Sequence, residues 1–222
     1  MKPASSSIEP PVAVEILGLP VRCITAEGLR DLMIARTQAG LRSFACYANA
    51  FTMNMAMNDA RYFGVLRDCG LLYADGASVV WASRFSSQRL PHRITAADHF
   101  PRLASASANA GLSIYLLGGR PGVARDASVK LKQDNPTLRI AGFHDGYFDL
   151  ADSTRVVEEI NAANPDILAV GMSSPRQEFW VEEHARRLNA KALWCVGALF
   201  DYLAGQESRA PAWMCIAGPK RI

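Results

Sequence analysis

Several sequence signals that would assign this chain to a familiar class of protein are missing. Its five cysteines are an odd number, are widely spaced and form no Cys-x-x-Cys pair, so we expect buried free thiols of a reduced compartment. The four histidines show no metal-ligand spacing, and there is no Asp-x-Asp pair. The nucleophile elbow Gly-x-Ser-x-Gly, the zinc motif His-Glu-x-x-His and the P-loop are also absent. These absences argue against the common hydrolase, nucleoside-triphosphatase and metal-dependent classes.

The sequence also has little that could cross a membrane. No uncharged apolar run reaches about 18 residues, the length at which a membrane-spanning helix is expected. The first residues, MKPASSSIEPP, contain no apolar segment of a secretory signal. Because they are rich in proline and serine, we expect residues 1–11 to be disordered. The sequence predicts a soluble or peripheral protein.

Neither sign of charge is in large excess. The chain has 24 Lys and Arg against 21 Asp and Glu, a formal net charge of +3, and a pI near 8.7. The basic residues are scattered, with Arg186–Arg187 and Lys220–Arg221 as the only adjacent pairs. Such a balance suits an anionic ligand or a membrane surface, and it does not indicate a nucleic-acid partner.

What the sequence contains is a regular alternation of short apolar runs and amphipathic segments. Half of its 222 residues are hydrophobic, enough for one domain with a sizeable core. Apolar runs at residues 12–17 and 21–24 flank Gly18–Pro20 and predict a small β-hairpin. Further strands are predicted at residues 43–47, 71–74, 112–117, 138–143, 167–170 and 192–196. Helices are predicted at residues 26–40, 50–69, 77–85, 96–109, 123–133, 153–163 and 176–188.

This alternation predicts the fold class. Strands that alternate with helices indicate an α/β protein with a doubly wound, largely parallel, Rossmann-like sheet, here preceded by the small N-terminal β-hairpin. In such a sheet, ligands bind in a crevice at the carboxyl ends of the strands. The residues that follow the predicted strands are therefore the candidates for a functional site.

The segment VGMSSPRQEFW, residues 170–180, is the most informative of these strand ends. Gly171 and two serines end a buried strand, and Pro175 suits the first position of the next helix. Arg176, Gln177 and Glu178 then lie at the expected ligand crevice. An arginine and an amide there suit diphosphates, sugar hydroxyls or bases, although a capped helix start with solvated polar residues fits the pattern equally well.

Two further strand ends carry polar or glycine-rich turns. Asp75 in LLYADGAS follows an apolar strand, where a carboxylate can be a general base, a metal ligand or a helix N-cap. The loop GGRPG, residues 118–122, follows another strand and can place a helix N-terminus against a phosphate. It is not Gly-x-Gly-x-x-Gly, so it gives only weak support for a dinucleotide-dependent oxidoreductase.

An arginine and a second aspartate complete the candidates. Arg93 in PHRITAAD precedes a helix that Thr95 can cap, and it is placed to pair with a phosphate or carboxylate unless it is a solvated loop residue. Asp201 in VGALFDYLAG follows the last strand, where it can accept hydrogen bonds from a base or sugar, or cap a helix.

An ordered series of motifs resembles the WecG/TagA/CpsF glycosyltransferase family, over roughly residues 12–218, which we take as a single domain. The series is more specific than any one of its members. It consists of YAN (47–49), ADGASVV (74–80), RITAAD (93–98), YLLGGRPGVA (115–124), GYF (146–148), INAANPDILAVGMSSPRQEFW (160–180), VGALFDYLAG (196–205) and RAPAW (209–213).

The resemblance implies an inverting, metal-independent transfer of a sugar from a UDP-sugar to a polyprenyl-diphosphate-linked sugar, in cell-surface polysaccharide biosynthesis. It implies no cofactor, a peripheral location at the inner face of the cell membrane, and possible self-association.

The resemblance also implies roles for individual residues. Asp75 is expected to be the catalytic base that takes the proton of the acceptor hydroxyl. Arg93 is expected to face a diphosphate, and Asn49 and Gln177 to orient sugar hydroxyls, with Tyr47 and Arg176 as further substrate-binding residues. The expected nucleotide-binding residues are Gly118, Gly119 and Asp201.

This chain departs from the family pattern at several positions. Tyr47 stands where members usually have threonine, and Ala96 and Ser174 stand where they usually have glycine, which bears on sugar specificity. Members typically continue beyond RAPxW into a basic, aromatic appendage, whereas this sequence stops at AGPKRI. We therefore expect weak membrane attachment and low activity for this form. The alternative is a non-catalytic family member that binds a lipid-linked sugar or a partner enzyme.

Overall fold

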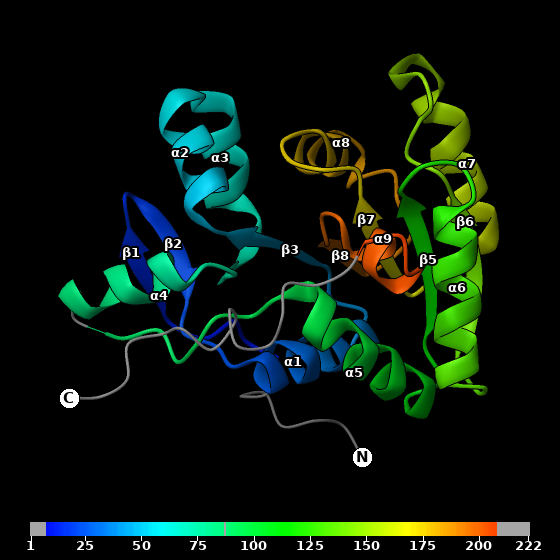
Figure 1. Ribbon diagram of the computed structural model, residues 1–222, viewed down its shortest axis with the longest axis horizontal. Coiled ribbons are helices and arrows are strands. Elements are labelled where there is room, and N and C mark those ends of the chain that lie inside the picture. The colour runs from blue at the N-terminus through cyan, green and yellow to red at the C-terminus, as the bar shows by residue number, and fades with distance from the viewer. Residues whose placement is uncertain (1–7, 87, 208–222) are drawn as a thin grey trace.

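The computed structural model describes residues 8–86 and 88–207 of the chain (Figure 1). Its centre is a six-stranded, all-parallel sheet with the strand order β4-β3-β8-β7-β5-β6, and a two-stranded antiparallel hairpin, β1-β2, stands apart from it. The predicted fold class is therefore confirmed. The hairpin strands are β1 (Ala13–Ile16) and β2 (Leu19–Arg22). The sheet strands are β3 (Ser43–Ala48), β4 (Gly70–Ala74), β5 (Ser113–Gly118), β6 (Arg139–His144), β7 (Ile167–Gly171) and β8 (Ala192–Cys195).

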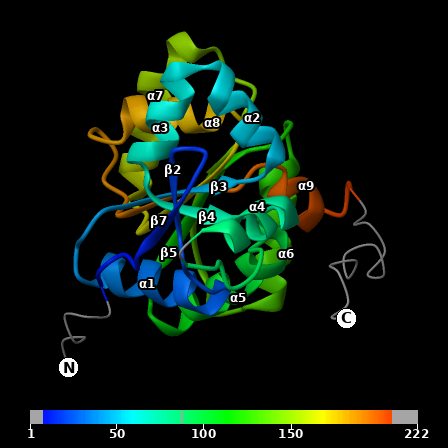
Figure 2. The same cartoon turned by 90° about the vertical axis from the view of Figure 1, so that its left-hand side faces the viewer.

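Helices cover both faces of the sheet. One face carries the hairpin together with α2 (Ala50–Asn58), α3 (Ala60–Asp68), α4 (Ala77–Ala82), α7 (Ser153–Ala163) and α8 (Arg176–His184). The other carries α1 (Ala26–Gln38), α5 (Ala96–Asn109), α6 (Val123–Asp134) and α9 (Leu199–Leu203). Short 3-10 turns are η2 (Ser83–Phe85) and η3 (Leu150–Asp152). Figure 2 shows α2, α3, α7 and α8 on one side of the strands and α1 and α5 on the other.

The sheet has one hydrophobic core on each face, because successive side chains of a strand point to opposite faces. In β5, Tyr115 and Leu117 pack into the core under α7 and α8, while Ile114 and Leu116 pack into the core under α5 and α6. All six residues of β5 are buried, as expected for a strand with helices on both faces. The sheet is therefore rigid, and its carboxyl edge is a stable platform for the loops.

The hairpin turn differs from its prediction by two residues. Leu17 and Gly18 form the turn with φ angles of +50° and +77°, so Leu19 and Pro20 belong to the second strand and pair with Ile16 and Glu15. A two-residue turn with two positive φ angles matches the twist of the paired strands, which explains why the tighter loop forms.

The helix predicted over residues 50–69 is two helices. Asp59 ends α2 in an extended conformation, and its Oδ1 accepts hydrogen bonds from the backbone N–H groups of Arg61 and Tyr62 to begin α3. Likewise, α8 ends at His184 rather than near residue 188, and Pro175 is its N-cap rather than its first helical residue.

Residues 8–11 also differ from the prediction of disorder for residues 1–11. The Arg36 guanidinium donates to the carbonyl of Ile8, and the Arg22 guanidinium donates to that of Pro11, so this stretch is held against the domain. The predicted disorder of residues 1–7 lies outside the described residues. Cys46, Cys69 and Cys195 are buried free thiols as predicted, Cys23 is a partly buried one, and Cys215 lies outside the described residues.

Candidate active site

Two adjoining pockets lie at the carboxyl edge of the parallel sheet. The first, here called the Asp75 pocket, has a volume of about 190 Å³ and opens beyond β3, β4 and β8. Its lining comprises Tyr47, Asn49, Asp75, Thr95, Ala96, Ala97, Val196, Gly197, Ala198, Leu199 and Tyr202. The second, the glycine pocket, measures about 290 Å³ and opens beyond β5, β6, β7 and β8. Because both are lined by Gly197 and Ala198, the turn after β8 separates them.

Asp75 stands directly beyond the last residue of β4. Its backbone N–H donates to the carbonyl of Ala48 at 2.9 Å, which fixes its position beside the end of β3. The N-cap of α4 is Gly76, without a side-chain cap, so the helix-cap interpretation of Asp75 is wrong. The carboxylate is instead free to face the pocket.

The electrostatics of Asp75 suit a base that works near neutral pH. Burial raises the pKa of Asp75 to about 6, while hydrogen bonds from the side chains of Thr95 and Asn49 and the positive charge of Arg93 oppose that rise. A carboxyl with this pKa is ionised at pH 7 but holds a proton far better than a solvated aspartate. This combination is what general base catalysis requires.

Asn49 reaches this carboxylate from the first turn of α2. Its Oδ1 accepts from the N–H of Thr52 at 3.0 Å, while the Thr52 hydroxyl accepts from the N–H of Asn49 at 2.9 Å, a reciprocal capping box. The amide oxygen is thereby committed to the helix. Its NH₂ group is the end that faces Asp75 or a bound hydroxyl.

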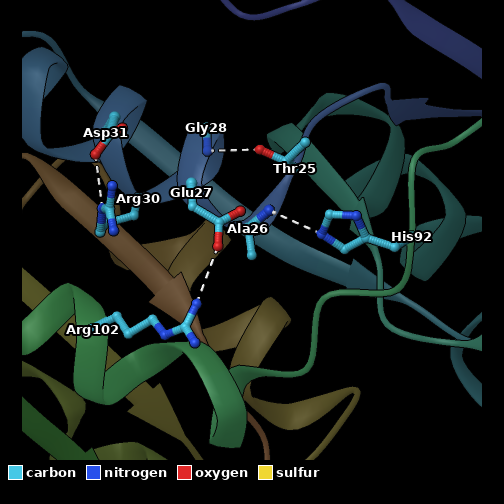
Figure 3. A network of polar contacts seen from close by, with 8 residues as sticks. All are labelled: Thr25, Ala26, Glu27, Gly28, Arg30, Asp31, His92 and Arg102. Atoms are coloured by element: carbon cyan, nitrogen blue, oxygen red, sulfur yellow. Dashed lines mark hydrogen bonds and ion pairs between the residues drawn. The ribbon is translucent and has the colours of Figure 1, made fainter. Parts of the chain in front are cut away.

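Thr95 and Arg93 come from the loop that precedes α5. Thr95 occupies the N-cap position of α5 but makes no capping hydrogen bond, contrary to the prediction, because its side chain turns to Asp75. Arg93 is partly buried and acts on Asp75 through its charge. Figure 3 shows how this loop is held: the Ala26 N–H donates to His92, and Arg102 of α5 pairs with Glu27 of α1 at 3.1 Å.

The glycine pocket combines open backbone with cationic side chains. Glycines follow four of its strands, and the guanidinium groups of Arg120 and Arg176 stand at its wall together with the carboxylates of Asp201 and Glu207. Arg176 donates from Nη2 to the carbonyl of Phe148 at 2.8 Å, while its buried Nε has no partner among the residues the structure describes. Such a pocket suits a ligand with phosphates and hydrogen-bonding rings.

The two predicted nucleotide glycines differ in their placement. Gly119 lines the pocket, although its N–H already donates to the carbonyl of Gly171 at 3.0 Å. Gly118 lies inside the sheet, where a Cβ would come within 2.1 Å of the same carbonyl oxygen. Because Gly118 has no side chain, strands β5 and β7 can lie close together at this point. Its role in nucleotide binding stays a prediction.

Asp201 lies in the first turn of α9 and lines the glycine pocket. The N-cap of α9 is Ala198, and no side-chain cap is present, so the capping interpretation of Asp201 is wrong. Its partly buried carboxylate is available to a ligand in that pocket.

Gln177 is fully buried below the two pockets rather than exposed in either. Its Oε1 accepts from the N–H of Gly197 at 3.1 Å, and its Nε2 donates to Oε1 of Glu178 at 2.8 Å. Its side chain therefore holds the turn that separates the pockets. Both ends of the amide are occupied by protein groups, and its predicted contact with a sugar hydroxyl stays a prediction.

Tyr47 and Ser174, two positions where this chain departs from the family pattern, touch one another. The Tyr47 hydroxyl and Ser174 Oγ are 3.0 Å apart, and Ser174 in turn donates to Oε1 of Glu178 at 2.7 Å. Burial raises the pKa of the Glu178 carboxyl, against the hydrogen bonds from Gln177 and Ser174. The sequence holds no signal for this contact, since the two residues are 127 positions apart.

The structure adds residues that sequence reasoning did not assign to the site. Thr95 and Gly197 contact the predicted residues directly, and Arg120 and Tyr147 line the glycine pocket. The motifs RITAAD, VGALFDYLAG, GGRPG and GYF contained all four, but only their position after a strand pointed to the site. Across residues 8–86 and 88–207, no group of three or more His, Cys, Asp or Glu side chains could hold a metal ion. None of the helices described there is long and apolar enough to cross a bilayer.

Comparisons with known proteins identify relatives of this chain. The chain is 35% identical over 160 residues to an N-acetylglucosaminyldiphosphoundecaprenol N-acetyl-beta-D-mannosaminyltransferase of Bacillus subtilis (strain 168), covering 72% of this chain and 61% of that protein. It is 33% identical over 168 residues to the protein of the same name from Staphylococcus aureus (strain MRSA252), covering 76% of this chain and 65% of the relative. The match thus spans less than two thirds of each relative's length. The model of the glycosyl transferase WecG/TagA/CpsF family matches residues 14–219, and the chain belongs to that family.

Proposed function

We propose that this chain transfers a sugar, with inversion and without a metal ion, from a UDP-sugar to a polyprenyl-diphosphate-linked sugar in cell-surface polysaccharide biosynthesis. The observation that carries the proposal is the carboxyl of Asp75, which has a pKa of about 6 and lines a pocket. A second pocket, suited to a diphosphate, adjoins it. The activity for which the two relatives are named, mannosaminyl transfer to an undecaprenol-linked sugar, supports the class of acceptor.

The proposed chemistry assigns one task to each pocket. Asp75 takes the proton of the acceptor hydroxyl while that oxygen attacks the anomeric carbon of the donor sugar. The new C–O bond forms on one face as the bond to the UDP oxygen breaks on the other, so the configuration inverts. The bonding electrons leave with UDP, and the proton on Asp75 passes to water afterwards.

UDP is proposed to occupy the glycine pocket. Its diphosphate would face the guanidinium groups of Arg120 and Arg176, where charge-assisted hydrogen bonds stabilise the growing negative charge of the leaving group. Asp201 would accept hydrogen bonds from the nucleoside. Arg93, which lies near Asp75, would then bind the diphosphate of the acceptor. Asn49 would bind a sugar hydroxyl.

The test is a transfer assay with a panel of donors. UDP-N-acetylmannosamine, its uronic acid, UDP-glucose and UDP-glucuronate are each offered with a short-chain polyprenyl-diphosphate sugar, and release of UDP and formation of product are measured. We expect one donor to be used, without added metal and in the presence of a chelator. Absence of turnover with every donor, combined with retained binding of the lipid-linked sugar, would support the non-catalytic alternative, which the departures at Tyr47 and Ser174 favour.

The Tyr47 hydroxyl provides a finer prediction about this site. Tyr47→Phe removes its hydrogen bonds to Ser174 and Gln177 and frees the turn at Gly197. We expect the KM for the sugar donor to rise by roughly three- to tenfold, the worth of one hydrogen bond. The acid limb of the pH profile, set by Asp75, should not move. Tyr115→Phe, in β5 outside both pockets, is the matched control, and equal effects of the two variants would contradict this prediction.

The family resemblance also leads us to propose peripheral attachment at the inner face of the cytoplasmic membrane and possible homo-oligomers. Sedimentation with and without liposomes that contain anionic lipid measures both.

A further inference from the structure

A third, larger cavity lies on the sheet face that carries the hairpin. This groove measures about 570 Å³ and runs between α2, α4 and the tip of the hairpin. Most of its lining is apolar, and Glu15 is the one ionisable side chain among its described lining residues. The apolar side chains that line it are Ile16, Leu17, Met53, Met57, Val79 and Ala82. A concave, apolar site of this size is in the range of small-molecule pockets.

The inner end of the groove lies beside the Asp75 pocket, although the two cavities share no lining residue. Ala50 lines the groove and directly follows Asn49, while Ser78 lines the opposite wall three residues after Asp75. Gly76 packs against Asn49 where the groove and the pocket adjoin, since a Cβ on Gly76 would be 3.1 Å from the Cα of Asn49. A ligand bound at Asp75 therefore has an apolar channel next to it.

The outer end of the groove is rimmed by exposed apolar side chains. Met57 is 47% exposed at the end of α2, and Trp81 and Phe85, beside the groove, are 54% and 79% exposed. The two aromatic rings pack edge to face with their centroids 5.1 Å apart. Figure 1 shows the hairpin and α4 at the left of the molecule, on the opposite side from α6 and α7. A chain leaving the groove would thus meet further apolar surface.

We infer that this groove binds the first isoprene units of the acceptor's polyprenyl chain. The inference rests on the proposed function. The acceptor sugar must bring its hydroxyl to Asp75, and the lipid, which is joined to that sugar through the diphosphate proposed for Arg93, then needs an apolar path away from the site. The groove is that path, because it starts at the residues next to Asn49 and Asp75, and none of the described residues that line it is a cation that would select an anion. Each methylene group removed from water there strengthens binding.

The first test compares two acceptors that differ only in the lipid. Both carry the same sugar diphosphate, one esterified to a methyl group and the other to a farnesyl chain. We expect the farnesyl acceptor to have the lower KM with the unaltered chain. Met57→Gln should raise that KM by about tenfold and leave the KM of the methyl acceptor unchanged, because a polar side chain then lines the outer groove. Val129→Gln is the matched control, since Val129 is 49% exposed on α6.

A second variant and a direct binding measurement complete the test. Ala82→Trp fills the groove from α4, and it should weaken binding of farnesyl diphosphate, measured by calorimetry, as Met57→Gln does. Sedimentation velocity shows whether either variant changes the oligomeric state.

If the methyl acceptor is turned over but neither variant alters farnesyl binding, the inference is overturned while the proposed function stands. If no acceptor is turned over but farnesyl diphosphate binding is lost in both variants, the groove stands and the proposed function fails. Loss of a dimer in both variants, without a change in farnesyl binding, would overturn the inference by assigning the groove to a second copy of the chain.

Discussion

Replacing Asp75 by asparagine is expected to lower kcat for sugar transfer by about 10²–10⁴-fold, the range measured when a general base is removed. The amide has nearly the shape of the carboxylate, and it can still accept a hydrogen bond from Thr95. The loss therefore reports the missing base rather than a rearranged pocket. Asp126→Asn is the matched control, because Asp126 lies on α6, outside both pockets, and pairs with the neighbouring Arg125 at 3.0 Å. A fall of less than tenfold in Asp75→Asn would remove this residue from the role of base.

The same carboxyl should set the acid limb of the pH profile. Transfer requires ionised Asp75, whose pKa burial raises to about 6. We expect kcat/KM to fall tenfold per pH unit below about pH 6 and to be flat just above it. An acid limb near pH 4 would show that the carboxyl is solvated in the working enzyme.

The stability of Asp75→Asn should move in the opposite direction to its activity. The pKa of this carboxyl is higher in the folded chain than its ordinary value of 3.8, so folding favours the protonated form. That contribution is fully present below about pH 4 and is lost as the pH rises through 6. At pH 8 the folded chain holds a buried charge, and the asparagine variant should be more stable by about 3 kcal/mol. Urea unfolding at pH 8 and pH 4 measures this difference, which should vanish at the lower pH.

Gly118→Ala is expected to lower the free energy of unfolding by about 3–5 kcal/mol, among the largest effects of a single methyl group. Its φ of +144° is reached almost only by glycine, and the added Cβ would be 2.1 Å from the carbonyl oxygen of Gly171. That oxygen is backbone of a central strand and cannot turn aside. Strands β5 and β7 would have to separate beneath the glycine pocket.

A second glycine separates the cost of the positive φ from the cost of the contact between the added Cβ and Gly171. Gly111 also has a positive φ, +71°, but nothing lies within 4 Å of its Cβ position. Gly111→Ala should therefore cost only the left-handed backbone, about 1–2 kcal/mol. Urea unfolding of both variants measures the difference, and equal losses would show that the contact with Gly171 is relaxed without strain.

Much of the fold follows from local sequence patterns. The parallel sheet and the position of each strand are predicted because apolar runs alternate with amphipathic helices, and Thr25 begins α1 as the sequence indicates, with its hydroxyl accepting from Gly28. The candidate residues follow as well. Asn49, Asp75, Gly119, Arg176 and Asp201 lie in the turns or first helical turns that follow predicted strands, and in a parallel sheet the carboxyl ends of all strands lie on one edge.

Other features of the site depend on which strands are neighbours. The order of the six strands puts β8 between β3 and β7, and only this order brings Gly197 against both Tyr47 and Gln177. No local pattern records that choice, because the pairing of β3 with β8 joins segments more than a hundred residues apart. The inward turn of Gln177 and the contact of Tyr47 with Ser174 are its consequences.

The sequence by itself determined the class of fold, the edge of the sheet at which the site lies and the residue types that it holds, because these depend on short-range periodicity. Tertiary structure alone decided which of those residues are buried, and hence that Asp75 has a raised pKa while Gln177 supports a turn. It also decided that α2, α4 and the hairpin leave a groove open beside the site. Burial and cavities are properties of the packed chain, since each depends on side chains that several distant elements contribute.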